Sequence, residues 1–206
     1  METDSLARQL RMKRSEMMLS ELEAVALRLF EQRGFADVTV EDIASEAKVS
    51  PRTFYRYFPA KEDVLQLRIE RRTEAMRVAL SARPEDEPPL HSFRMALEQE
   101  VSTEDTELLG RWIAVIIASP TLLRSVVGGI HLKSHQMMAE FFGSRLGVPS
   151  DALEPRVLAA SIGGVIQAAQ TYWYLNGGDL ATTISESLEI LERGTAGSER
   201  QRLPSP

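Results

Sequence analysis

Residues 48–61 read KVSPRTFYRYFPAK, and this stretch decides the fold. Ser50 followed by Pro51 is a helix start, with serine at the N-cap and proline at the first helical position. Pro59 disfavours helical backbone in the residue before it, so the helix ends just ahead of that proline. The stretch predicts a short helix that carries both basic and aromatic side chains.

A second short helix is predicted upstream, over residues 40–47. Thr39 and Asp42 have the spacing of a capping box, although the aspartate that would form the return bond is shorter than the preferred glutamate. An apolar stripe from Leu22 to Phe30 predicts a helix before it, ended by Gly34. Two short helices three residues apart are typical of a helix-turn-helix, whose second helix enters the major groove of DNA.

The chemistry of the second helix suits DNA. Arg52 and Arg56 are four residues apart, so they share one helical face and can reach phosphates or a guanine edge. Further candidate contacts are Thr53, Tyr55, Tyr57 and Lys61. The alternative for Tyr55 is that its ring packs and only its hydroxyl meets phosphate, and the alternative for Arg52 is a solvated arginine.

The run from Ala26 to Leu65 resembles the DNA-binding domain of TetR-family transcriptional regulators. The matching residues are Ala26, Phe30, Gly34-Phe35, Thr39-Val40, Ile43-Ala44, Val49-Ser50, Thr53-Phe54-Tyr55, Tyr57-Phe58 and Lys61-Glu62. Two positions depart from the pattern. Lys48 stands where the turn usually has glycine, and Ala60 replaces the usual Ser or Asn cap.

The resemblance implies an all-α homodimer with three N-terminal helices on operator DNA and a C-terminal helical effector-binding and dimerisation domain. It implies DNA contacts at Thr39, Ser50, Arg52, Thr53, Tyr55, Tyr57 and Lys61, with Arg52 and Arg56 as the base readers here and Ala44 and Lys48 as lesser contacts.

The remainder of the chain also reads as helices, about nine in all. The six helices that follow the helix-turn-helix are expected near residues 60–80, 90–101, 104–118, 120–146, 152–175 and 179–193. A charged, proline-rich linker is expected at 83–89. The predicted organisation is a DNA-binding domain over 1–60, an effector and dimerisation domain over 61–194, and a disordered tail over 195–206.

Composition narrows the class of protein. The 206 residues include no cysteine, no secretory signal and no apolar run long enough to span a membrane, so a cytoplasmic protein is expected. Residues 1–80 hold 14 Lys and Arg against 14 Asp and Glu, so residues 81–206 carry the whole net charge of −6. No nucleophile–base set, carboxylate pair or phosphate loop indicates an enzyme, and no cofactor is expected.

The C-terminal half resembles regulators of the mycofactocin-system type in the run from Leu109 to Arg124, which implies an acyl-CoA-like or other lipophilic effector. An apolar pocket is expected from Trp112, Ile116, Met137, Met138, Phe141 and Gln167. Methionines and aromatics at helical spacing are also typical of plain core, which is the alternative for each.

Two stripes are candidates for the dimer interface by family analogy. They are Val157, Ser161, Val165 and Tyr172 on one helix and Ile184, Leu188 and Leu191 on the next. The alternative is that both stripes are core within one subunit. His131 and His135 have i, i+4 spacing but no third ligand, so we interpret them as surface or pocket-wall histidines and not as a metal site.

The sequence therefore predicts a ligand-responsive homodimeric repressor that binds a near-palindromic operator. An activator or ligand-independent regulator would carry the same DNA-binding residues. A helical protein-binding adaptor is the alternative of another class, and it would bind DNA weakly and without sequence preference.

Overall fold

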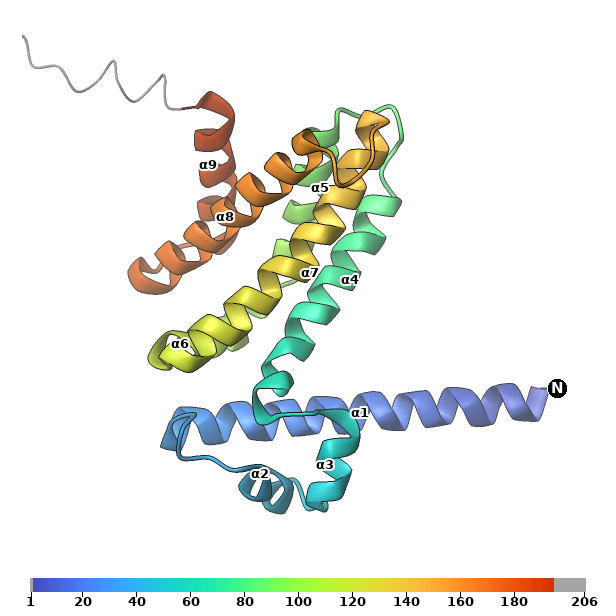
Figure 1. Ribbon diagram of the computed structural model, residues 1–206, viewed down its shortest axis with the longest axis vertical. Helices are drawn as coiled ribbons and strands as arrows, with labels where there is room; N and C mark the ends of the chain where they lie inside the picture. Colours follow the sequence, from blue (N-terminus) through green and yellow to red (C-terminus); the bar gives the residue numbers. More distant parts are fainter. Residues whose placement is uncertain (1, 195–206) are drawn as a thin grey trace, which may run out of the picture. The chain divides into compact units, whose positions relative to one another are not determined.

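The fold is all-α, as predicted. The computed structural model describes the backbone of residues 2–194 and the side chains of 9–124 and 132–194. Within residues 2–194 the chain forms nine α-helices and one 3-10 helix and no strand (Figure 1). None of the described helices combines the length and the apolar character needed to cross a membrane. The predicted tail at 195–206 lies outside the described residues.

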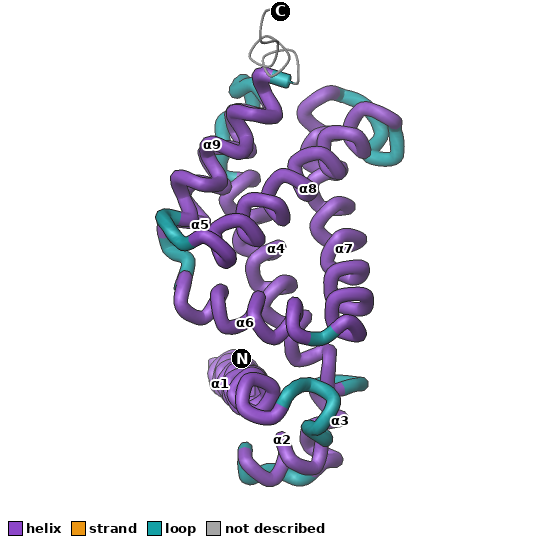
Figure 2. Tube along the Cα trace, turned by 90° about the vertical axis from the view of Figure 1, so that its left-hand side faces the viewer, coloured by secondary structure: helices purple, strands orange, loops and turns teal. Residues whose placement is uncertain are grey.

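The helices follow the predicted order. They are α1 (Glu2–Arg33), α2 (Val40–Glu46), α3 (Pro51–Tyr57), η1 (Lys61–Leu65), α4 (Gln66–Ser81), α5 (Pro89–Ser102), α6 (Thr106–Ala118), α7 (Pro120–Leu146), α8 (Leu153–Asn176) and α9 (Leu180–Arg193). Short loops join them (Figure 2). Two differences from expectation stand out: the helix predicted at 60–80 opens with a 3-10 segment, and α1 reaches back to Glu2.

The chain divides into two compact units. The first holds residues 1–71 and 110–130, and the second holds 72–109 and the described residues from 131 onward. The helices α4, α6 and α7 pass from one unit into the other along the chain. This division assigns 61–71 and 110–130 to the unit that contains α1–α3, whereas the sequence-based boundary lies at residue 60.

Apolar side chains from every element of the helix-turn-helix form the core of the first unit. The apolar stripe of α1 is buried from Leu22 to Phe30, and α1 packs against α2 and η1. Phe54 is completely buried, and the ring centroid of the nearly buried Phe58 lies 5.5 Å away. This aromatic pair uses the inner face of α3 for packing, which leaves the outer face available.

Capping bonds determine where α2 and α3 begin. The Asp42 amide donates to Thr39 Oγ1 at 3.1 Å, and the Thr39 amide donates to Asp42 Oδ2 at 2.9 Å, so the short aspartate does complete the capping box. The Thr39 hydroxyl also donates to Asp42 Oδ2, and this bond, followed by the one from the Thr39 amide, holds the pKa of Asp42 below its usual value. The Thr53 amide donates to Ser50 Oγ at 3.1 Å, which confirms the predicted start of α3.

The turn between α2 and α3 contains the one described non-glycine residue with positive φ. Lys48 has φ 55°, the left-handed conformation that its replacement of the usual glycine predicts. Its side chain is exposed and its backbone continues the turn, since the Lys48 amide donates to the Ser45 carbonyl at 3.1 Å.

The second unit buries the inner faces of α8 and α9. Ile184 and Leu188 of α9 are each 2% exposed, and α9 packs against both α8 and α5. Phe93 of α5 stacks on Phe142 of α7 with centroids 5.7 Å apart. Helix α7 also approaches α8 closely, because a Cβ at Gly163 would lie 2.3 Å from His135 Nε2.

Lys48→Gly should raise the free energy of unfolding by about 1 kcal/mol, since glycine adopts positive φ without the steric penalty of a Cβ. Chemical denaturation with matched m-values measures the gain. Lys48→Ala is the control, because alanine removes the charge and keeps the strain. Equal stability of the two variants would contradict the strain argument.

Candidate functional site

The outer face of α3 presents cations and phenols to solvent. Arg52 and Arg56 are exposed, and neither forms an ion pair with a described residue. Tyr55 is 53% exposed, although its ring still meets Phe54 edge-on with centroids 5.8 Å apart. The Tyr55 ring therefore packs against Phe54 and is at the same time accessible to solvent.

Arg56 and Tyr57 form a preordered pair beside this face. The Arg56 guanidinium donates to the Tyr57 hydroxyl at 3.2 Å and lies 4.8 Å from the centroid of the same ring. The phenol accepts this bond, so its own proton remains available for a phosphate oxygen. The remaining guanidinium N–H groups can donate to DNA, and the ring contact limits the conformations that Arg56 must lose on binding.

The hydroxyl groups at the helix starts have fewer protons to offer. Thr39 Oγ1 donates to Asp42 Oδ2 at 2.6 Å, so the one hydroxyl proton of this cap is already used. Ser50 Oγ and Thr53 Oγ1 lie 2.9 Å apart and share one bond, which leaves one of their two protons for a ligand. Contacts of Ser50 and Thr53 with phosphate stay predictions, and a contact from Thr39 would require its cap bond to rearrange.

Lys61 has a structural role that its sequence position did not reveal. Its ammonium donates to the carbonyls of Phe35 and Val38, each at 2.7 Å, and lies 4.2 Å from the Phe35 ring centroid. Two of its three donors therefore hold the loop between α1 and α2. A phosphate contact remains a prediction that depends on the third N–H.

The second unit contains a pocket of about 590 Å³, within the range typical of small-molecule sites. Its apolar wall is Leu80, Met137 and Phe141. The polar lining is Arg77, Ser81, Arg83, Glu85, Glu140, Ser144 and Arg145. The end of α4, the linker after it and the last turns of α7 thus surround a volume lined by both apolar and charged side chains.

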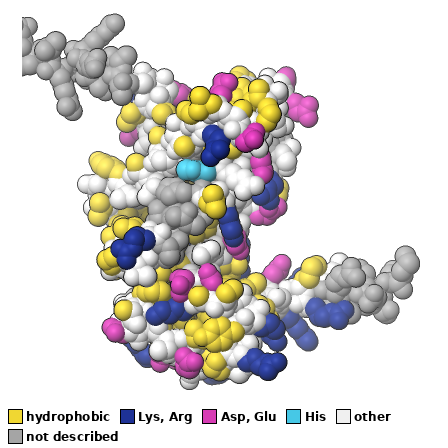
Figure 3. Space-filling model, viewed as in Figure 1, with side chains coloured by type: hydrophobic (Ala, Val, Ile, Leu, Met, Phe, Trp, Pro, Cys, Tyr) yellow, Lys and Arg dark blue, Asp and Glu magenta, His cyan; other side chains and the backbone are white. Residues whose placement is uncertain are grey.

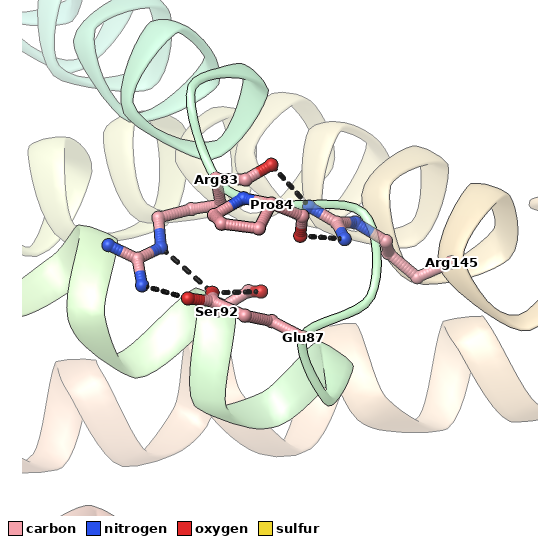
Figure 4. Close-up of polar contacts among 5 residues, drawn as sticks. All are labelled: Arg83, Pro84, Glu87, Ser92 and Arg145. Atoms are coloured by element: carbon pink, nitrogen blue, oxygen red, sulfur yellow. Dashed lines mark hydrogen bonds and ion pairs between the residues drawn. The ribbon is translucent and has the colours of Figure 1, made fainter.

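Two arginines hold the linker at the rim of this pocket (Figure 4). Arg145 of α7 donates to the carbonyls of Arg83 and Pro84, and its guanidinium lies 5.3 Å from the Phe141 ring centroid. Arg83 pairs with Glu87. The bond from Arg83, followed by one from the Ser92 hydroxyl at 2.8 Å, keeps the pKa of Glu87 below its usual value.

Only part of the predicted pocket set lines this volume. Met137 and Phe141 do, whereas Met138 is buried core at 3% exposure and Gln167 is an exposed side chain of α8.

Trp112 and Ile116 belong to the first unit, so the structure does not bring them to this pocket. The Trp112 indole donates to the Leu65 carbonyl at 3.1 Å, and Ile116 is 3% exposed. Their periodicity indicated an apolar environment correctly but could not distinguish core from cavity.

Some of the residues predicted for the dimer interface are exposed, and others are buried in the subunit core. Val157, Tyr172 and Leu191 are 52%, 60% and 37% exposed, and Ser161 and Val165 are half-buried. Ile184 and Leu188 are core residues of the subunit, since α9 turns that face toward α5 and α8. The prediction that these two face a partner is therefore corrected.

Only one side chain of the histidine pair, that of His135, lies among the described residues. His135 is half-buried where α7 meets Gly163 of α8, and the side chain of His131 lies outside the described residues. No group of three or more His, Cys, Asp or Glu able to hold a metal occurs among the described residues.

Sequence reasoning missed most of the polar pocket lining. Arg83 and Arg145 are 62 residues apart and meet through a bond from the guanidinium of Arg145 to the carbonyl of Arg83. Local periodicity carries no signal for such a contact, although a basic residue in the last turn of α7 is a weak one.

Two family models match successive parts of the chain. The family model described as "Bacterial regulatory proteins, tetR family" matches residues 23–67, and the model described as "MftR C-terminal domain" matches 70–196. The HTH-type transcriptional regulator TcmR of Streptomyces glaucescens is 32% identical over 186 residues, which cover 86% of this chain and 80% of TcmR.

Solved structures share the fold. A TetR-family regulator from Syntrophomonas wolfei has a TM-score of 0.65 at 18% identity, with 87% of this chain and 97% of that chain covered. FadR of Thermus thermophilus, a repressor solved with lauroyl-CoA, has a TM-score of 0.56 at 22% identity, with 91% and 98% covered. The chain belongs to the TetR family of DNA-binding transcriptional regulators, and its C-terminal half is of the MftR type.

Proposed function

We propose that this TetR-family regulator is a homodimeric, ligand-responsive repressor that acts in the cytoplasm on a near-palindromic operator. The single observation that carries the proposal is the outer face of α3, where Arg52, Arg56 and Tyr55 are exposed while Phe54 anchors the helix from beneath. In helix-turn-helix dimers such helices enter successive major grooves about 34–36 Å apart or a multiple of that distance.

An uncovered face of α8 supports dimerisation. At steps of three or four residues it carries the exposed apolar side chains Leu153, Val157, Tyr172 and Leu175, with the smaller Ser161, Gly164 and Ala168 between them. A Cβ added at Gly164 would meet no atom within 4 Å, so this middle section is open within the subunit. Small residues between large apolar ones allow two copies of α8 to cross closely, with Leu191 and Ile190 of α9 as further exposed apolar candidates.

The pocket supports an amphipathic effector. Met137 and Phe141 offer an apolar wall to an acyl chain, and Arg145 offers guanidinium donors to a polar head. The lauroyl-CoA ligand of T. thermophilus FadR has this chemistry, and we extend it to this chain as an acyl-CoA-like class of effector.

The proposed response runs through α4. This helix begins directly after η1 in the first unit and ends with Leu80 and Ser81 in the wall of the pocket. A ligand that moves the end of α4 would change the spacing between the two reading helices. A coupling of about 1–3 kcal/mol is typical of allostery and would lower operator affinity 5- to 150-fold.

An activator or ligand-independent regulator keeps the same DNA face, and a transcription readout combined with effector titration separates these alternatives. The adaptor alternative of another class is tested by sequence preference in DNA binding. A footprint on DNA upstream of the coding region identifies the operator for all of these measurements.

Arg52→Ala and Arg56→Ala should each weaken operator binding by about 1–3 kcal/mol, because each removes a base or phosphate contact. Fluorescence anisotropy measures the Kd, and Tm should stay unchanged because both side chains are exposed. Lys61→Ala is the comparison variant: it should also lower Tm, since two carbonyls lose their donor. Unchanged operator affinity in both arginine variants would show that α3 is not the reader.

Ser144→Trp should raise the lauroyl-CoA concentration needed for operator release at least tenfold, because the indole fills the pocket from an exposed position on α7. Operator affinity without ligand should not change. Leu132→Trp, on an exposed position of the same helix, is the control. If lauroyl-CoA and shorter acyl-CoAs leave the wild-type Kd unchanged, the acyl-CoA-like assignment fails.

Gly164→Arg should convert the dimer into monomers, because a charged side chain enters the centre of the exposed α8 face. Sedimentation velocity measures the state, and far-UV circular dichroism should show an intact subunit. Gln99→Arg, at an exposed position of α5, provides the control. A dimer that persists in Gly164→Arg would place the interface elsewhere.

A further inference from the structure

The N-terminal part of α1 extends beyond the packed body of the first unit. Figure 1 shows this helix continuing alone past α3, and Figure 2 views it nearly along its axis. None of residues 9–21 is buried, and burial starts at Leu22. We call residues 8–21 the arm. At 1.5 Å per residue, Arg11 lies about 16 Å beyond Leu22 along the helix.

The arm concentrates positive charge in one run. Residues 8–14 read RQLRMKR and contain four basic residues and no acidic one. Arg11, Lys13 and Arg14 are exposed, and none makes an ion pair with a described residue, although Glu16 follows closely. Lys and Arg side chains gather where α1 extends beyond the packed body of the first unit (Figure 3).

Three of the four basic residues, all except Lys13, lie on the side of α1 that its packed part turns inward. By the 3.6-residue period Arg11 shares a face with Leu22 and Leu29, both of which are buried in the first unit. Along the arm the same face has no covering element within that unit. Arg8, Arg11 and Arg14 follow at i, i+3 and i+6, and like charges at this spacing oppose helix formation unless an anion lies beside them.

We infer that the arm is a second DNA-binding element, which contacts the phosphate backbone flanking the half-site read by α3. The inference rests on operator binding by α3. The arm and α3 belong to one unit, and Figure 1 shows the arm extending from the side of that unit on which α3 lies, so an operator held by α3 brings a polyanion near the arm. The arm offers lysine and arginine without a base-reading geometry, so it adds affinity and salt dependence but no sequence preference.

A membrane surface is the other polyanion to consider, because basic helices with apolar residues also bind lipid. The exposed apolar side chains of the arm are Leu10, Met12 and Met17. Leu10 and Met17 are seven residues apart and share a face, but Lys13 and Arg14 lie on that same face between them, and Met12 lies on the opposite side of the helix. A membrane-binding helix gathers its apolar residues on one face. The arrangement therefore favours DNA.

The test compares the full chain with the triple variant Arg11→Ala/Lys13→Ala/Arg14→Ala on operator duplexes with long and short flanks. Loss of three phosphate contacts should reduce the slope of log K against log salt by about 2.7 for each bound subunit. The ratio of variant to wild-type Kd should then fall about 40-fold per subunit between 50 and 200 mM salt. The difference should disappear on the duplex with short flanks.

Two controls define the result. Arg156→Ala/Arg193→Ala removes two exposed arginines of the second unit and should leave the slope of log K against log salt unchanged. Arg11→Lys/Arg14→Lys keeps the positive charges of the arm and should also show the wild-type slope. An unchanged slope in the triple variant overturns the inference, as does a loss of binding to phosphatidylserine vesicles with DNA binding intact. Failure of wild type to bind any duplex would instead reject operator binding itself, which the α3 variants test separately.

Discussion

The ammonium of Lys61 is the contact on which the DNA-binding unit depends. It joins the start of η1 to the Phe35 and Val38 carbonyls, which belong to the loop between α1 and α2. That loop leads directly into the Thr39 cap of α2. The Lys61 side chain therefore connects the residues that follow α3 with the residues that precede α2. The cation also covers the Phe35 ring, and Phe35 in turn meets Phe30 of the α1 core edge-on at 5.1 Å.

Helix α3 of the helix-turn-helix uses its inner face for packing and its outer face for exposed basic side chains. Phe54 and Phe58 hold α3 from one side, and Ser50 determines where the helix starts. The outer face then carries Arg52 and Arg56 with no described carboxylate to neutralise them. The hydroxyls that cap the helices are largely engaged in bonds within the protein, so the guanidinium groups and phenols remain as the main uncommitted donors on this face.

The second unit combines a buried apolar core with a pocket rim that is held by polar contacts. Ile184, Leu188 and Phe142 are buried, whereas the pocket is bounded by the α4–α5 linker held through bonds from Arg145. These bonds go to carbonyls, so a ligand group that accepts from Arg145 would compete with the linker directly. In the proposed response, this competition would connect occupation of the pocket with the position of the linker that follows α4.

The sequence by itself determined the helices, the caps, the strained turn at Lys48 and the exposed basic face of α3, because each depends on residues within one or two turns. Only the tertiary structure decided which apolar stripes are core, since periodicity describes one face of a helix and not what covers it. Ile184 proved to be core, Trp112 joined the first unit, and Lys61 turned inward to two carbonyls. The pocket needed Arg83 and Arg145 to meet across 62 residues, a pairing that no local pattern encodes.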